Sequence, residues 1–416
     1  MPPPIGFFRT AEGLVCDGVS LAAIASAAGT PVYVYSAAVL RERYAEIDRA
    51  FGTWPHAIHY ALKANSTLSV ARLLRSLGSG ADANSAWEIE VAGRAGFAPS
   101  AIVCTGVGKS PAELECAVAL GVKAINVESA GELKRIAAVA RKLSRVAPVA
   151  VRVNPDIDAQ SHPHISTGLR INKFGVPADQ AAGLFRSIAA SPSLRLVGVH
   201  LHVGSQITTL EPLRRAARAA ADVSRALVAQ GFPLEYVDLG GGLGIAYDDR
   251  HPPAIETYVA ALVDEVRSTG LPIIVEPGRV IAGPAGVLVA RVVDIKPRDP
   301  GSDFAILDAG MTELLRPALY GAYHRIEPVA VHDRAERTYE IVGPVCESSD
   351  VIGRDRRLRE LQVGDLVAIR DAGAYGAVMA SNYNRRPLPC EVLVDDGSWR
   401  VIRRRQTIDD QLALET

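Results

Sequence analysis

His59-Tyr60-Ala61-Leu62-Lys63-Ala64-Asn65 is the stretch around which the rest of the chain can be organised. It completes a short apolar strand, predicted over residues 57–62, and then turns polar at Asn65. A lysine in this place lies at the mouth of a sheet, and a lysine amine becomes a nucleophile when desolvation or a cationic neighbour lowers its pKa. A solvated lysine at a strand end is the alternative interpretation, and this segment alone favours it.

Short apolar runs like this one recur along the chain, and helical stretches such as residues 66–77 and 212–230 lie between them. Eight runs are predicted to be strands, at residues 58–63, 80–83, 102–106, 124–127, 149–153, 196–202, 236–239 and 273–276.

Three of the predicted helices begin with the pattern Ser-x-x-Glu, which is typical of a capping box. The pairs are Ser85 with Glu88, Ser110 with Glu113 (and Pro111 at the first helical position), and Ser129 with Glu132. Each pair follows a predicted buried strand, as a βα loop should. Repeated βα units with short loops predict a (β/α)8 barrel of the TIM type, whose active site lies at the C-terminal ends of the strands. A doubly wound open sheet is the alternative fold, and the number of strands favours the barrel.

After about Gly283 the pattern changes to β-like runs with turns, at residues 287–295, 304–307, 337–342, 366–370 and 390–394, followed by a tail helix at 407–414. An earlier helix is predicted at residues 20–28 and an earlier strand at 31–35. We therefore predict an N-terminal segment (1–38) that packs with the β domain, a barrel (39–283) and a mostly β C-terminal domain (284–416).

Length and charge limit the class of ligand. The chain has 416 residues, 48% of them apolar, which is enough for a barrel of roughly 200 to 250 residues and a second domain. Its 45 basic and 46 acidic residues give a net charge of -1. This balance offers no electrostatic footprint for nucleic acid or for an anionic membrane. We therefore expect a small-molecule ligand, no nucleic-acid partner and no membrane partner.

The five cysteines (Cys16, Cys104, Cys116, Cys346 and Cys390) are odd in number and lack CxxC spacing, which argues against a disulfide framework and against a zinc site. We expect no metal. Residues 1–4 do not look like the start of a signal peptide, and the most apolar window, 273–293, carries charged residues with several Gly and Pro. These features predict a protein of the reducing cytoplasm.

Polar residues and glycines follow the predicted strands of the barrel. They are Lys63 after the first strand, His200, His202 and Ser205 around the end of the sixth, Gly240, Gly241 and Gly242 after the seventh, and Glu276, Gly278 and Arg279 after the eighth. Glycine loops let backbone N–H groups approach a phosphate, which barrels often bind after strands seven and eight, and a guanidinium suits a phosphate. Three glycines alone are often only a tight turn. A lysine for an imine, a phosphate cradle and a carboxylate for a ring nitrogen together match the needs of pyridoxal phosphate.

The ordered motifs resemble the diaminopimelate decarboxylase family, in the alanine-racemase-like fold (fold type III) of pyridoxal-phosphate enzymes shared with the ornithine and arginine decarboxylases. The resemblance covers nearly the whole chain. Its motifs are YALKAN at 60–65, RVNP at 152–155, HP at 162–163, STGL at 166–169, NKFG at 172–175, HVGSQ at 202–206, GGG at 240–242, EPGR at 276–279, RP at 316–317, LY at 319–320, GPVCESSD at 343–350, AGAY at 372–375 and SNYN at 381–384.

This resemblance implies pyridoxal 5'-phosphate as the cofactor. Lys63 would form the imine, and His202 would stack on one face of the ring. The phosphate would be bound by Ser205, Gly240, Gly241, Gly242, Gly278, Arg279 and Tyr375. Glu276 would pair with the pyridine nitrogen and keep it protonated, as decarboxylation requires, whereas racemases that resemble this fold have an arginine in that place.

The family's pattern also implies the substrate, meso-2,6-diaminopimelate, and the products L-lysine and CO2 of the last step of lysine biosynthesis. Arg279, Arg316 and Tyr320 would receive the distal carboxylate, Glu347 would bind the distal ammonium, and Tyr375 would also contact the substrate. A substrate with an amino acid at both ends needs a cation and an anion to recognise the end that does not react. Cys346, from the neighbouring subunit of a homodimer, would return a proton to the carbanion.

Alternatives on the same fold are a decarboxylase of ornithine, lysine or carboxynorspermidine, a racemase, and a non-catalytic cofactor-binding homologue. Ornithine and lysine lack the distal carboxylate and would leave a buried Arg316 unpaired, at a cost of about 1 to 3 kcal/mol or more. Glu276 argues against a racemase, and the presence of Lys63 with the phosphate loop argues against a non-catalytic homologue. His200 is predicted to be a hydrogen-bonded core residue, the cysteines other than Cys346 are predicted to be core, and Trp87 is predicted to narrow one side of the pocket.

Overall fold

The computed structural model describes residues 4–159, 162, 167–169, 171–298 and 301–416. Residues 1–3, Pro163 and Ser166, which the sequence analysis used, lie outside these ranges. The chain divides into two compact units, residues 43–245 with 251–280 and residues 1–42 with 246–250 and 281–416. Across the described residues, no helix has both the length and the apolar character needed to cross a membrane.

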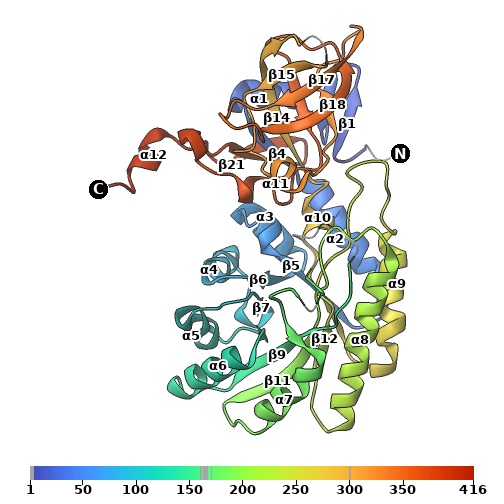
Figure 1. Ribbon diagram of the computed structural model, residues 1–416, viewed down its shortest axis with the longest axis vertical. Helices are drawn as coiled ribbons and strands as arrows, with labels where there is room; N and C mark the ends of the chain where they lie inside the picture. Colours follow the sequence, from blue (N-terminus) through green and yellow to red (C-terminus); the bar gives the residue numbers. More distant parts are fainter. Residues whose placement is uncertain (1–3, 160–161, 163–166, 170, 299–300) are drawn as a thin grey trace. The chain divides into compact units, whose positions relative to one another are not determined.

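Eight parallel strands form a closed barrel in the first unit (Figure 1). They are β5 (His56–Ala61), β6 (Gly80–Ala83), β7 (Ile102–Cys104), β8 (Ala124–Val127), β9 (Ala147–Asn154), β11 (Leu194–His200), β12 (Tyr236–Asp238) and β13 (Ile273–Val275). The last strand, β13, pairs in parallel with β5 and so closes the ring. The barrel prediction is therefore confirmed, and the open doubly wound alternative is wrong. A short strand, β10 (Val176–Pro177), pairs with the end of β9.

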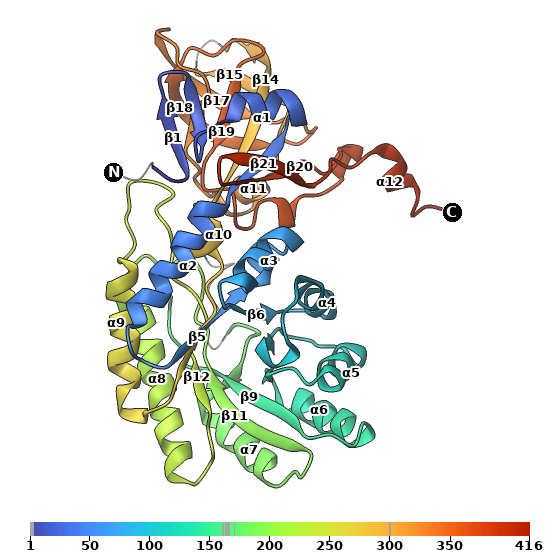
Figure 2. The same cartoon turned by 180° about the vertical axis from the view of Figure 1, so that it is seen from behind.

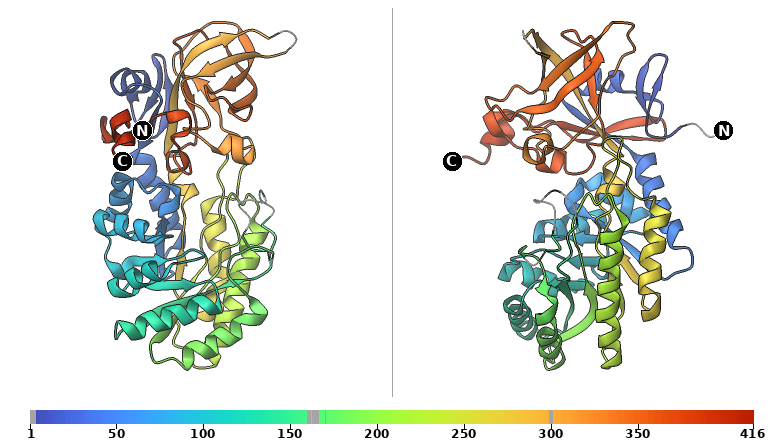
Figure 3. Two further views of the ribbon diagram at one scale, coloured as in Figure 1. Left: turned by 60° about the vertical axis from the view of Figure 1, so that its left-hand side comes forward. Right: turned by 45° about the vertical axis from the view of Figure 1, so that its right-hand side comes forward.

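Helices lie outside the barrel strands, as both views of Figure 3 show. They are α3 (Leu68–Ser76), α4 (Ala86–Ala95), α5 (Pro111–Leu120), α6 (Ala130–Lys142), α7 (Ala178–Ala189), α8 (Leu210–Ala229) and α9 (Ile255–Val266), and α2 (Ala37–Phe51) leads into the barrel. Apolar positions spaced three and four residues apart turn one face of each helix toward the strands. In α8 this buried face includes Leu213, Ala217, Ala220 and Leu227.

The three predicted N-terminal serines all cap their helices, because the side chains of Ser85, Ser110 and Ser129 accept backbone N–H groups of the third helical residue. Only Ser110 and Glu113 form a reciprocal capping box. The other two glutamates reach one residue further back: Glu88 accepts the backbone N–H of Asn84, and Glu132 accepts that of Glu128. The prediction of three capping boxes was therefore right for one of them.

The second unit is mostly β and is labelled in Figure 2. Its strands are β1 (Phe7–Thr10), β2 (Gly13–Cys16), β3 (Val19–Ser20), β4 (Val32–Ser36), β14 (Gly286–Lys296), β15 (Asp303–Leu307), β16 (Ile326–Pro328), β17 (Glu336–Val342), β18 (Val351–Arg359), β19 (Leu366–Ile369), β20 (Cys390–Asp395) and β21 (Ser398–Arg403). Its helices are α1 (Leu21–Ala28), α10 (Arg279–Ala282), which begins in the barrel unit, α11 (Arg316–Tyr320) and α12 (Ile408–Leu412). The N-terminal strand β4 lies inside the main sheet, antiparallel to β14 and parallel to β20.

The core of this unit is formed by buried side chains from α1, β4, β14 and β20, among them Ile24, Val34, Val287 and Val392. Residues from both ends of the chain are therefore needed to build one hydrophobic cluster. All five cysteines are described and none forms a disulfide. Cys16, Cys104 and Cys390 are buried as predicted, whereas Cys116 is partly exposed on α5, so its assignment to the core was wrong.

Candidate active site

Lys63 lies in the 3-10 turn η1 (Leu62–Ala64) that directly follows β5, so the strand ends two residues earlier than the predicted run to Lys63. Its Nζ donates a hydrogen bond to Asp82 Oδ2 at 2.8 Å, and the Asp82 side chain is fully buried while that of Lys63 is 33% exposed. Asn84 Nδ2 donates to the same oxygen at 3.3 Å. A buried carboxylate on β6 thus fixes the direction of an accessible amine.

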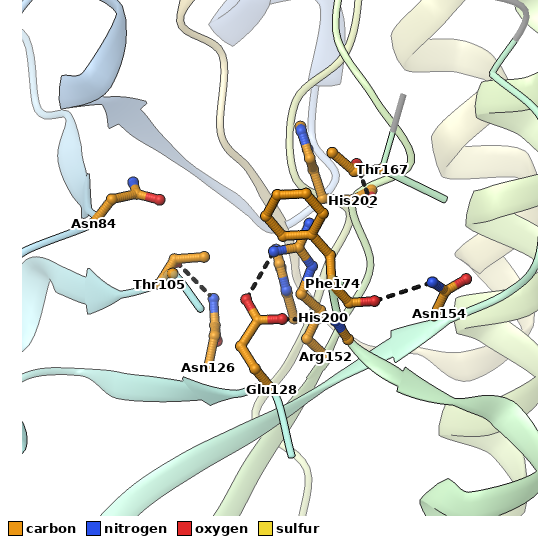
Figure 4. Close-up of polar contacts among 12 residues, drawn as sticks. Asn84, Thr105, Asn126, Glu128, Arg152, Asn154, Thr167, Phe174, His200 and His202 are labelled. Carbon is orange, nitrogen blue, oxygen red and sulfur yellow. Dashed lines mark hydrogen bonds and ion pairs between the residues drawn. The ribbon is translucent and has the colours of Figure 1, made fainter. Parts of the chain in front are cut away.

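His202 follows β11, and two backbone-linked contacts orient it. Gly241 N donates to His202 Nδ1 at 3.1 Å, and Thr167 Oγ1 donates to the His202 carbonyl oxygen at 2.9 Å (Figure 4). Burial, followed by the positive charges of Lys63 and Arg152, holds the pKa of His202 well below its usual range. The imidazole is therefore neutral, with Nδ1 as an acceptor and the proton on Nε2.

The glycines after β12 allow a close backbone approach. Gly240 and Gly242 have φ angles of +60° and +127°, which favour glycine. A Cβ at Gly240 would lie 2.7 Å from His202 Nδ1, and a Cβ at Gly241 would lie 2.4 Å from the Glu276 carbonyl oxygen. No side chain fits at either position, so the loop presents bare backbone.

Arg279 and Ser205 meet in the same unit. Arg279 is buried, and its Nη2 and Nε donate to Ser205 Oγ at 2.9 and 3.3 Å. At Gly278, a Cβ would come within 2.9 Å of the Ala64 Cβ, so glycine is required where the chain after β13 passes the Lys63 turn. A buried guanidinium, a hydroxyl and a glycine loop form a donor set suited to an anion such as a phosphate.

Glu276 directly follows β13 and is 3% exposed. His200 Nε2 lies 3.4 Å from Glu276 Oε2, whereas Glu276 Oε1 has no hydrogen-bond partner among the described residues. Burial raises the pKa of Glu276, but the charge and hydrogen bond of His200 and the charge of Lys63 outweigh it and hold the pKa well below its usual range. The site therefore contains a buried, charged carboxylate with spare acceptor capacity.

These observations fit pyridoxal phosphate. Lys63 would supply the amine, the glycine loop with Ser205 and Arg279 would supply donors for a phosphate, and Glu276 would supply an acceptor for a protonated ring nitrogen.

A buried ion pair completes the polar interior of the barrel, and the sequence analysis did not predict it. Arg152 Nη1 donates to Glu128 Oε1 at 2.8 Å, and the guanidinium carbon lies 4.9 Å from the centre of the Phe174 ring (Figure 4). Glu128 Oε2 accepts the backbone N–H of Gly175 at 2.7 Å. The pair therefore ties the chain after β9 to the barrel.

In the second unit, Arg316 begins α11 and is 4% exposed. Its Nη1 donates to His324 Nε2 at 2.6 Å, and its guanidinium carbon lies 4.4 Å from the centre of the Tyr247 ring. Because arginine only donates, His324 Nε2 is an acceptor, and His324 Nδ1–H then donates to the Arg370 carbonyl oxygen at 2.7 Å. His324 and Tyr247 were not predicted from the sequence, because they stand in no recognisable motif.

Cys346 and Glu347 are exposed on a loop between β17 and β18. The buried Asp350 carboxylate holds this loop, because Asp350 Oδ2 accepts the backbone N–H of Val345 at 2.7 Å. Asn384 Nδ2 donates to Cys346 Sγ at 3.2 Å. A thiol that is exposed and hydrogen-bonded can exchange a proton with a ligand.

The predicted site residues thus fall into two sets. Lys63, His202, Ser205, Gly240, Gly241, Gly242, Glu276, Gly278 and Arg279 belong to the barrel unit, and Arg316, Tyr320, Cys346, Glu347 and Tyr375 belong to the second unit. Tyr375 has a φ of +56°. His200 is a hydrogen-bonded core residue as predicted, and its partner is Glu276. The Trp87 side chain is 83% exposed on α4.

Comparisons with known proteins identify the family. The family described as "Pyridoxal-dependent decarboxylase, pyridoxal binding domain" matches residues 37–283. The chain is 46% identical to a diaminopimelate decarboxylase of Vibrio cholerae, over 97% of this chain and 96% of that protein, and 45% identical to one of Neisseria meningitidis, over 97% of both. A crystal structure of diaminopimelate decarboxylase from Helicobacter pylori complexed with L-lysine has a TM-score of 0.92 and 41% identity, and it covers 95% of this chain and 98% of that one.

This agreement extends over nearly the whole chain, so it includes the barrel, the β domain and both sets of site residues. It confirms the resemblance inferred from the motifs. The chain belongs to the diaminopimelate decarboxylase family, within the pyridoxal-dependent decarboxylases.

Proposed function

We propose that this protein removes CO2 from meso-2,6-diaminopimelate and releases L-lysine, with pyridoxal 5'-phosphate as its cofactor, as the last step of lysine biosynthesis. The observation that carries the proposal is the near-full-length identity of 45 to 46% with diaminopimelate decarboxylases. A cytoplasmic location, which keeps thiols reduced, suits the free Cys346.

The barrel residues would hold the cofactor. When bound, pyridoxal phosphate supplies an electron sink for the pair of electrons left on the α-carbon after the carbon–carbon bond breaks. Lys63 binds it through Nζ, which the buried Asp82 aims. The glycine loop, Ser205 and Arg279 bind the phosphate, with Tyr375, and Gly278 leaves room beside them. Glu276 keeps a proton on the ring nitrogen because its own charge is buried and maintained.

The residues proposed to recognise the substrate carry the charges that its distal end requires. In this proposal Arg316, Tyr320 and Arg279 bind the distal carboxylate, Tyr375 also contacts the substrate, and Glu347 binds the distal ammonium. The buried Arg316 supports this assignment because His324 and the Tyr247 ring already fix its guanidinium. A substrate without the distal carboxylate would leave part of this cation unpaired, which penalises ornithine and lysine as substrates.

Cys346 is proposed to return a proton from Sγ to the α-carbon. The N–H of Asn384 Nδ2, which donates to Sγ at 3.2 Å, would stabilise the thiolate left behind. The α-carbon then carries hydrogen in place of the lost carboxylate, as L-lysine requires.

We also propose a homodimer in which Cys346 acts on substrate bound by the Lys63 of the other subunit. Mixed refolding of Lys63→Ala and Cys346→Ala chains tests this directly. If each site takes residues from two subunits, each mixed dimer has one intact site, and the whole mixture regains up to about a quarter of the wild-type activity, although each variant alone is inactive. No recovery in a mixture shown to contain mixed dimers would mean that each subunit works with its own Cys346.

The activity itself is tested by measuring CO2 release and identifying the product from purified protein with pyridoxal phosphate. Diaminopimelate, ornithine, lysine and arginine are supplied separately. Turnover confined to diaminopimelate, with lysine as product, is expected. Turnover of ornithine or lysine instead would overturn the assignment of Arg316 and Glu347 but leave the fold and cofactor in place.

Replacing Lys63 with alanine should abolish both turnover and the visible absorbance of the lysine-linked cofactor, because no other group supplies that amine. Lys142→Ala is the matched control, since the Lys142 side chain is 65% exposed on α6 and, among the described residues, forms an ion pair only with Glu115. Activity that survives Lys63→Ala would remove Lys63 from the mechanism.

A further inference from the structure

Three buried polar side chains meet inside the barrel: His200 on β11, Asp238 on β12 and Glu276 after β13. One nitrogen or carboxylate oxygen of each lies within 4.8 Å of those of the other two. The strand register explains the meeting. His200 is aligned with Asp238, and Asp238 is aligned with Ile274, which precedes Glu276 by two residues on the same strand face.

The two carboxyl groups leave a hydrogen-bonding problem that a single proton solves. Asp238 Oδ1 accepts the backbone N–H of Gly240 at 2.9 Å. Asp238 Oδ2 and Glu276 Oε1 are both buried and have no hydrogen-bond partner among the described residues. Two ionised carboxylates here would repel each other in a low dielectric and would leave two buried acceptors unpaired.

We propose that Asp238 is a neutral carboxylic acid whose Oδ2–H donates to Glu276 while its Oδ1 accepts the Gly240 N–H. Asp238 is then a positioning residue that joins the glycine loop to the carboxylate that faces the cofactor ring. The inference rests on the proposed function, because that function gives Glu276 and the loop their roles.

Charges around the pair place the proton on Asp238. Burial, followed by the negative charges of Glu276 and then Asp82, raises the pKa of Asp238 well above its usual range, and the proposed hydrogen bond to Glu276 acts in the same direction. His200 and Lys63 face Glu276 and favour its charged form. The phenols of Tyr236 and Tyr258, whose pKa values burial raises, face Asp238 as neutral groups.

This arrangement leaves Glu276 able to act. Each carboxylate oxygen has two lone pairs, so Glu276 can accept from Asp238, from His200 and from a protonated ring nitrogen together. The Asp238 hydroxyl stabilises the Glu276 anion without adding a second charge. The hydrogen bond from Gly240 fixes Asp238 in turn. The distance between the glycine loop, which is proposed to bind the phosphate, and Glu276, which is proposed to pair with the ring nitrogen, is thereby held constant.

The test compares Asp238→Asn with Asp238→Leu. An asparagine amide keeps both contacts, since its oxygen accepts from Gly240 and its nitrogen donates to Glu276, whereas leucine is similar in size and keeps neither. Asp222→Asn is the matched control, because the Asp222 side chain is 57% exposed on α8. Three readouts apply: the Kd for pyridoxal phosphate, the pH dependence of the bound cofactor's visible spectrum, and the infrared C=O stretch of a protonated carboxylic acid, assigned with 13C-labelled aspartate.

We expect wild-type holoenzyme at neutral pH to show a protonated aspartate band that both Asp238 variants lose and Asp222→Asn retains. Asp238→Asn should keep the Kd within about threefold and the spectrum unchanged, and Asp238→Leu should weaken binding by about tenfold or more and shift the spectrum, as loss of a buried hydrogen bond to a charged group implies.

Two results would overturn the proposal. The first is absence of the protonated aspartate band. The second is an increase in Kd and a spectral shift in Asp238→Asn equal to those in Asp238→Leu, which would mean that Asp238 acts as an anion. If the leucine variant does not fold, the asparagine variant and the infrared band still decide. The infrared band does not depend on the cofactor, so it tests the protonation of Asp238 by itself. Failure to bind pyridoxal phosphate would instead contradict the proposed function.

Discussion

Replacing Arg316 with alanine is expected to weaken recognition of ligands with a distal carboxylate far more than recognition of a diamine that lacks this group. The guanidinium is buried, donates to His324 Nε2 at 2.6 Å and stacks 4.4 Å from the centre of the Tyr247 ring. These contacts fix the side chain before a ligand arrives, so little conformational entropy is lost when a carboxylate binds.

The magnitude follows from the loss of a charge-assisted hydrogen bond. Such a bond contributes about 1.5 to 3 kcal/mol, and each 1.4 kcal/mol is a factor of ten in affinity, so the KM for diaminopimelate should rise by about 10- to 150-fold. The L-lysine product keeps the distal carboxylate, so its inhibition constant should rise by a similar factor. The diamine 1,5-diaminopentane lacks this carboxylate, and its inhibition constant should change by less than about threefold.

The assay is steady-state kinetics on diaminopimelate, together with the inhibition constants of L-lysine and of 1,5-diaminopentane. Arg354→Ala is the control, since the Arg354 side chain is 68% exposed. Arg316→Lys keeps the charge but loses the planar fork and should fall between wild type and alanine. Because alanine removes the Arg316 donor to His324, circular dichroism at the assay temperature must first show a folded variant. A rise in the inhibition constant of 1,5-diaminopentane equal to the rise in the KM for diaminopimelate would refute the assignment of Arg316 to the distal carboxylate.

Two further predictions concern stability. Burial, followed by the charge of Lys123, lowers the pKa of His59 from 6.5 to about 4. Between these pH values only the unfolded chain binds the proton. The free energy of unfolding should therefore fall by about 1.4 kcal/mol for each unit by which the pH drops through this window. The free energy of unfolding, measured with urea at pH 5 and 7, should lose this pH dependence in His59→Gln but keep it in His251→Gln, because His251 is exposed. An unchanged pH dependence in His59→Gln would contradict the assignment. Glu128→Gln should lower the free energy of unfolding by about 3 to 5 kcal/mol, because it leaves Arg152 charged and buried. Glu115→Gln should lower it by less than about 1 kcal/mol, because the side chains of the Lys142–Glu115 pair are 65% and 43% exposed. Equal losses on thermal unfolding would contradict this.

Barrel strands were predictable because they are buried on both faces and therefore read as apolar runs. The predicted limits of 80–83 and 124–127 match β6 and β8 residue for residue. Strand β18 was missed, because its sequence, VIGRDRRLR, is rich in arginine. Its charges are accommodated at the surface, where Arg357 pairs with Glu336 on the neighbouring β17. Local composition does not reveal a strand whose side chains are solvated and paired across the sheet.

The candidate site could be predicted only where residues lie in recognisable motifs. Lys63, the glycine loop and Arg279 stand in short ordered runs, and general chemistry connects them with a phosphate and an imine. Asp82 and His324 stand in no such run, although they orient Lys63 and Arg316. Asp82 precedes the predicted helix start at Ser85, and its position at the end of a buried strand was the one available signal.

The amino-acid sequence by itself determined the class of fold, the cofactor and the family, because hydrophobic periodicity and the order of chemically required residues are local properties of the chain. Only the tertiary structure decided which polar groups share a proton or an ion pair. His200, Asp238 and Glu276 stand 38 residues apart from one to the next, and they meet because the register of three neighbouring parallel strands brings them together inside the barrel. Hydrogen bonding and charge depend on distances of a few ångströms, and folding sets those distances between residues that the sequence keeps far apart.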